Sequence, residues 1–89
     1  MAATERLIDV SGLEPCEPLE RTLAAAAELV PGEYLRVLHR REPHPLFPLL
    51  EKLGCAWRCR PGTDTPYEVL VWRADDPVAA AAAAAAAEG

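Results

Sequence analysis

The sequence predicts one small α+β domain: a two-layer α/β sandwich in which two helices cover one face of a four-stranded mixed sheet. Two segments with leucine and alanine at helical spacing each follow a short apolar segment typical of a strand. A pair of alternating segments separated by a turn cluster then predicts a hairpin. The order of elements is therefore βαβαββ, and a chain of 89 residues fits a single domain.

The first strand–helix unit is predicted from residues 7–10 and 17–30. The strand is short, and two glutamates lie in the first turn of the helix, where negative charge is favoured. Pro31-Gly32 ends the helix. The apolar residues that recur every three or four positions on one face are Leu19, Leu23, Ala26, Ala27 and Val30.

The second unit is predicted from a strand at 34–38 and a helix that begins at 44–47. Prolines before and within the first helical turn confine the helix start, and Gly54 is suited to the position after the helix end. The amphipathic pattern of this helix consists of Leu46, Leu49, Leu50 and Leu53.

The hairpin is predicted from strands at 56–60 and 67–73, joined by a Pro- and Gly-containing turn at 61–66. Alternation places Cys55, Trp57 and Cys59 on the same side. Right-handed crossovers put both helices on one face of the sheet and leave the other face open. The predicted core is Leu23, Leu35, Val37, Leu49, Leu50, Leu53 and Val69.

Residues 74–89 are predicted to form an Ala-rich tail outside a domain at 6–73. Asp76 could cap a helix that begins at Pro77, and nine consecutive alanines follow. A helix of this length is marginal in water, and it lacks large side chains for docking. We therefore expect the tail to be frayed and dispensable for folding.

Charge and cysteine content limit the functional classes. A net charge of −5 argues against nucleic-acid binding, although Arg36, Arg40, Arg41, Arg58 and Arg60 leave open a local basic patch, with a solvated face as the alternative. The sequence shows no targeting segment and no membrane-spanning segment. Three cysteines form no disulfide framework, which predicts reduced thiols and a cytoplasmic location.

The candidate site lies in the two loops that follow the first two strands. Ligands of open α/β sheets bind at the carboxyl ends of parallel strands, so these loops converge if the two strands are neighbours. Cys16, at the start of a helix, is the candidate catalytic thiol and the most reactive of the three. The candidate ligand-binding residues are Glu14, His39, Arg41, Glu42 and His44.

Metal binding is an alternative use of the same loop. His39 and His44 could hold a metal ion or haem together with Glu42 or Cys16, but the spacing matches no metal signature. Cys55 and Cys59 lie roughly 13 Å apart along a strand, too far to share one zinc ion. We predict no metal site and no cofactor.

The segment Gly12-Leu13-Glu14-Pro15-Cys16-Glu17-Pro18 resembles the Gly-Leu-x-Cys-Pro-x-Pro signature of the TusA-like (SirA-like) sulfur carriers. It more closely resembles an uncharacterised bacterial branch with a "GLEPPEP"-type motif. Relative to the carriers, Pro15 occupies the carrier-cysteine position, and Cys16 is displaced by one residue, about 100° around a helix.

A second resemblance to the same branch is Leu38-His39-Arg40-Arg41-Glu42-Pro43-His44-Pro45-Leu46. The two resemblances and the βαβαββ order together cover about residues 7–73. They imply a strand order of 1-2-4-3, with the fourth strand antiparallel to the others. They imply no agreed activity, because the branch is uncharacterised.

Two functional hypotheses follow. The first is a non-enzymatic accessory or binding module that presents the two loops, or the open sheet face, to a protein partner or small ligand. The second is a sulfur carrier that bears a persulfide on Cys16. The displaced register of the thiol ranks the binding module first. We expect a monomer or a weak homodimer.

Overall fold

The computed structural model describes residues 3–12 and 17–88 of the chain. The elements are β1 (Thr4–Asp9), α1 (Glu17–Ala27), β2 (Glu33–His39), α2 (Leu46–Lys52), β3 (Cys55–Pro61), β4 (Tyr67–Arg73) and α3 (Pro77–Glu88). One sheet has the order β1-β2-β4-β3, in which β1 is parallel to β2 and β4 is antiparallel to β2 and β3. The α+β class and the βαβαββ order are confirmed, and the strand order is the one that the resemblance implied.

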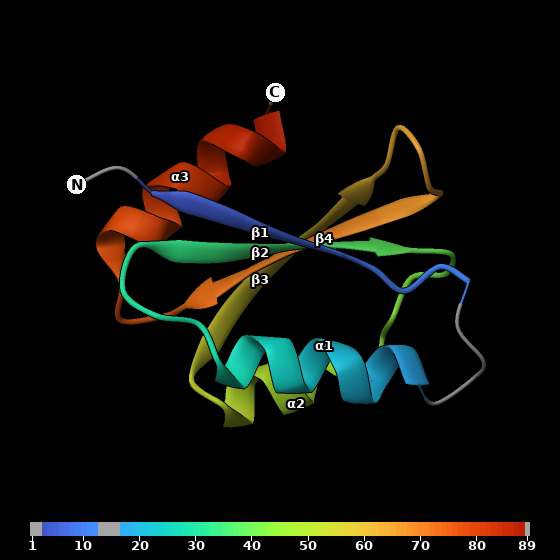
Figure 1. The fold of residues 1–89 in the computed structure, drawn as a ribbon, viewed down its shortest axis with the longest axis horizontal. Coiled ribbons are helices and arrows are strands. Elements are labelled where there is room, and N and C mark those ends of the chain that lie inside the picture. The colour runs from blue at the N-terminus through green and yellow to red at the C-terminus, as the bar shows by residue number, and fades with distance from the viewer. Residues whose placement is uncertain (1–2, 13–16, 89) are drawn as a thin grey trace.

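Helices α1 and α2 lie side by side on one face of the sheet and form the predicted two-layer sandwich with it (Figure 1). The third helix, α3, lies on the opposite face (Figure 1). The expectation of an open second face is therefore wrong.

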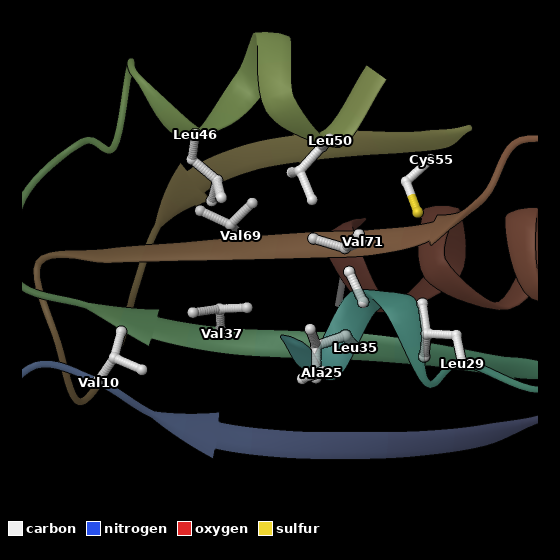
Figure 2. Close-up of a cluster of buried hydrophobic side chains, with 11 residues drawn as sticks. Val10, Ala25, Leu29, Leu35, Val37, Leu46, Leu50, Cys55, Val69 and Val71 are labelled. Carbon is white, nitrogen blue, oxygen red and sulfur yellow. The ribbon is translucent and has the colours of Figure 1, made fainter. Parts of the chain in front are cut away.

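The core between the sheet and α1 and α2 is aliphatic. Figure 2 shows Leu46 and Leu50 pointing from α2 toward Val69 and Val71 of β4. Of the predicted core, Leu35, Val37, Leu50 and Val69 are fully buried. Leu23 and Leu49 are half-buried, and Leu53 is 39% exposed. Leu53 is exposed because it is the C-cap residue, where the chain leaves the helix.

The sequence predicts the C-terminal end of α2 correctly and that of α1 incorrectly. Gly54 has a φ of +77° and donates its N–H to the carbonyl of Glu51 at 3.0 Å, as predicted for the position after the end of α2. The prediction that α1 reaches Val30 is wrong. Leu29 bonds the carbonyl three residues back, and this tighter turn buries Leu29 while Val30 is 53% exposed.

Helix α3 packs against the sheet without large side chains. Ala79 and Ala83, four residues apart on one stripe, are fully buried against Tyr34 and Leu70. The small alanine side chain lets the helix backbone approach the sheet closely. The expectation of an undocked tail is therefore wrong, because docking here depends on close approach instead of bulky anchors.

Both ends of α3 are held by polar side chains. One carboxylate oxygen of Asp76 accepts from the N–H of Ala79 at 3.1 Å, and the other accepts from the N–H of Gly32 at 2.8 Å. At the other end, the guanidinium of Arg60 donates to the carbonyls of Ala86 and Ala87 at 3.0 and 2.7 Å. Asp76 thus caps the start of α3, as the sequence predicted, and Arg60 of β3 satisfies carbonyls at its end.

Replacement of Leu50 by alanine is expected to lower the free energy of unfolding by about 2–5 kcal/mol, because it opens a cavity in the aliphatic core. Chemical denaturation monitored by circular dichroism measures this change. Leu53→Ala is the matched control on the same helix and should have a much smaller effect. An equal loss in the two variants would contradict the packing.

Replacement of Asp76 by asparagine is expected to lower the melting temperature more than Asp75→Asn, since only Asp76 joins α3 to the turn at Gly32. Hydrogen bonds from the N–H groups of Gly32 and Ala79 lower the pKa of Asp76. A carboxylate with a lowered pKa stabilises the fold above its unfolded pKa and loses this effect as the pH falls through its folded pKa. The difference from wild type should therefore narrow on acidification. A difference that grows toward acidic pH would refute this role.

Candidate functional site

The two strand-to-helix loops begin at the same edge of the sheet. Asp9 pairs with Leu38 in the parallel register of β1 and β2, and the N–H of Val10 donates to the carbonyl of Leu38 at 3.0 Å. The first two strands are therefore neighbours, as the resemblance implied, and the condition for the two loops to converge is met. We call residues 10–12 and 39–45 the loop edge. The candidate residues Glu14 and Cys16 lie outside the described residues.

The first part of the loop edge begins as a tight turn. The carboxylate of Asp9 accepts hydrogen bonds from the backbone N–H and the hydroxyl of Ser11, at 3.0 and 2.6 Å. These bonds lower the pKa of Asp9, so the carboxylate stays ionised. Val10 is only 3% exposed and packs in the aliphatic core, so it holds the turn in place. The direction in which the chain leaves β1 is thus set by local hydrogen bonds and one anchor.

The second part of the loop edge turns around His39. This half-buried ring accepts the backbone N–H of Arg41 at Nδ1, at 3.2 Å, so the proton of the neutral ring is on Nε2. Burial lowers the pKa of His39, and the charge of Arg40 lowers it further. His39 is therefore neutral at neutral pH and holds the turn that carries two exposed guanidinium groups.

Glu42 and His44 meet at the outer side of the same loop. The Oε2 atom of Glu42 lies 3.0 Å from Nε2 of His44, and both side chains are substantially exposed. Buried Pro43 lies between them in the chain. Of the described candidates, the structure therefore brings together two adjacent pairs: His39 with Arg41, and Glu42 with His44.

An aromatic row continues from this loop to the edge of the sheet. The ring of His44 meets Phe47 edge-on at 6.0 Å, and Phe47 stacks on Trp57 at 5.0 Å and 7°. Cys59 lies two residues after Trp57 on β3; burial raises the pKa of its thiol, and the charge of Glu42 raises it further. The sequence does not predict this row, because Phe47 and Trp57 lie on different elements and only packing brings them together.

The five arginines considered as a basic patch have different roles. Arg36 bridges two carboxylates on the α3 face of the sheet, with Glu5 at 2.8 Å and buried Glu68 at 2.7 Å. The hydrogen bond with Glu5 is the main reason that the pKa of Arg36 is raised. Arg60 caps α3. Only Arg40, Arg41 and Arg58 are exposed, and the first two lie on the loop edge.

Metal-ligating clusters and membrane-spanning helices are both absent from residues 3–12 and 17–88. In that part of the chain, no three His, Cys, Asp or Glu side chains are grouped so that they could hold a metal ion. No helix there is long and apolar enough to cross a membrane.

Comparison with known proteins adds a family. Residues 7–73 match the family described as "Uncharacterized conserved protein (DUF2249)". The chain belongs to this family. No curated protein and no solved structure matches it significantly. In this DUF2249 protein the matched residues run from within β1 to the end of β4, and they include the whole loop edge.

Proposed function

We propose that this DUF2249 protein is a non-enzymatic binding module that recognises an anionic group of its ligand or partner at the loop edge. The observation that carries the proposal is the hydrogen bond from the backbone N–H of Arg41 to Nδ1 of His39. This bond fixes the turn from which Arg40 and Arg41 project into solvent. Guanidinium groups are the side chains best suited to carboxylate and phosphate oxygens, because they donate in pairs.

The position of the turn supports the same function. It lies at the carboxyl ends of two neighbouring parallel strands, where open α/β sheets bind their ligands. The whole chain carries a net charge of −5, which does not attract anions. An anion at the loop edge is therefore attracted by the local positive charge of this turn. Glu14 and Cys16 belong to this proposed site by sequence, since they precede α1.

The proposed kinship is with the TusA-like (SirA-like) domains. The observed order β1-β2-β4-β3 agrees with the order that the resemblance implied, and residues 12–18 carry the Gly-Leu and the second Pro of the signature in register. A cytoplasmic location is part of the proposal and rests on the cysteine pattern.

Inorganic phosphate is the first probe of the loop edge. Titration should shift the backbone amide signals of residues 10–12, 39–42 and 44 in a two-dimensional NMR spectrum; Pro43 and Pro45 carry no amide proton. Arg41→Gln is expected to weaken the apparent affinity by about tenfold. Arg58→Gln removes an exposed arginine from β3 and should leave the affinity unchanged. Equal weakening in both variants, or shifts spread over the whole domain, would refute recognition at the loop edge.

A second candidate function is that of a sulfur carrier that uses Cys16. Among the three thiols, burial raises the pKa of Cys55 and Cys59, so both are poorer nucleophiles at neutral pH than an ordinary cysteine. Cys16 directly precedes α1 in the chain and is the remaining thiol. It would take one sulfur atom from a persulfide donor, whose own thiol is then released.

Incubation with a cysteine desulfurase and its substrate, followed by mass spectrometry of the intact protein, tests this function. The binding-module proposal predicts that Cys16 gains no additional sulfur. Cys16→Ser and Cys59→Ser serve as matched variants. An added sulfur atom that persists in Cys59→Ser and is absent from Cys16→Ser would establish the carrier function instead.

A further inference from the structure

Among residues 3–12 and 17–88, no strand pairs with the outer edge of β1, the edge that faces away from β2. The N–H groups of Thr4 and Val10 donate to carbonyls at the two ends of β2, at 2.9 and 3.0 Å. Backbone groups alternate in direction along a strand, so the odd-numbered residues between them direct their N–H and C=O groups away from β2. These residues are Glu5, Leu7 and Asp9. A free edge of this kind can pair with another strand.

A groove lies beside this edge, on the face of the sheet that carries α1 and α2. A cavity of about 390 Å³ lies between β1 and α1, and Ile8, Val10 and Ala25 are among its apolar lining residues. Arg21 and Glu28 of α1 also line it. On the opposite face of the same strand, Leu7 is 58% exposed, the highest value among the exposed large apolar residues of the described chain. Apolar surface is thus available on both faces of the free edge.

On α1, the charged residues at the two ends of the groove have opposite signs, Arg21 at one end and Glu28 at the other. Glu28 lies at the level of Arg6, since their side chains approach to 3.9 Å. Helix α1 runs antiparallel to β1, because it connects two parallel strands. Arg21 precedes Glu28 by seven residues, about 10.5 Å along the helix, which corresponds to about three strand residues. Arg21 therefore lies near the level of Asp9, and the midpoint between the two charges falls near Leu7 and Ile8.

We propose that a second copy of this chain docks on this edge, with β1 antiparallel to β1 of the partner, so that the two sheets join into one. A two-fold axis through the middle of β1 brings Arg21 opposite the partner's Glu28, and Glu28 opposite the partner's Arg21. The charge pattern of α1 along the groove is therefore complementary to itself, as a symmetric interface requires.

Charge also selects the register of the pairing. If Leu7 lay opposite the partner's Leu7, Glu5 would face the partner's Asp9, and two carboxylates directly opposite each other are destabilising. With Ile8 opposite the partner's Ile8, Leu7 faces the partner's Asp9 and no like charges are directly opposed. The two Leu7 side chains are then diagonal neighbours across the axis.

The second edge of the sheet is less suited to pairing. Edge strand β3 carries Arg58 and Arg60 and ends in Pro61, which lacks an N–H group. The exposed charge of Arg58 and the missing donor at Pro61 both oppose self-association of this strand, whereas the guanidinium of Arg60 caps α3. The proposed interface therefore uses β1.

Sedimentation equilibrium of the full chain over a range of concentrations tests the proposal. The mass should rise from that of the monomer to twice that value. Arg21→Glu and Glu28→Arg should each weaken dimerisation by about tenfold, because each variant places like charges across the axis twice. The double variant Arg21→Glu/Glu28→Arg restores opposite charges across the axis and should dimerise more tightly than either single variant. Glu51→Arg makes the same charge change on exposed α2 and should have no effect.

Amide exchange identifies the edge independently of charge. The N–H groups of Leu7 and Asp9 should become protected as the concentration rises, whereas the N–H of Val10, already bonded to β2, should not change. A chain that remains monomeric at about 1 mM would overturn the proposal. So would a dimer that is insensitive to the charge reversals, or one that the double variant does not restore.

Discussion

The antiparallel pair of β2 and β4 is buried on both faces, and the rest of the fold is arranged around this constraint. On one face, Leu35, Val37, Val69 and Val71 are fully buried beneath α1 and α2. On the other face, Tyr34 and Leu70 are covered by α3. A sheet of four strands with only one covered face would leave these central residues in water. The Ala-rich helix is therefore the second cover of the sheet.

Burial of a charge on the α3 face imposes a further requirement. Glu68 of β4 is almost completely buried, and an isolated carboxylate there would be strongly destabilising. Arg36, on the adjacent strand β2, compensates this charge at 2.7 Å and also binds Glu5 of β1. The guanidinium thus links three of the four strands. An arginine in the middle of a strand is thus used in ion pairs within the sheet.

The candidate site depends on the same topology in a different way. Because β1 and β2 are parallel neighbours, the loops that follow them begin side by side, and the turn at His39 lies next to the turn at Ser11. Hydrogen bonds within each turn then set the direction of its side chains.

Local sequence determined the elements whose signals are local. Leucine spacing and Gly54 located α2, alternation located β3 and β4, and residues 7–73 contain all of the features by which the family is recognised. The order of elements also placed the candidate residues in the loops that follow the first two strands, whereas the neighbouring of these loops depends on the strand order, which was implied by the family resemblance and is seen in the sheet. Only the tertiary structure decided the positions that depend on distant partners. Alanines with no predicted contact dock as α3 because two residues far away in the chain hold its ends: the N–H of Gly32 binds the capping carboxylate of Asp76, and Arg60 binds the last carbonyls. Phe47 meets Trp57, and Arg36 meets Glu68, through packing and strand register, which no short stretch of sequence contains.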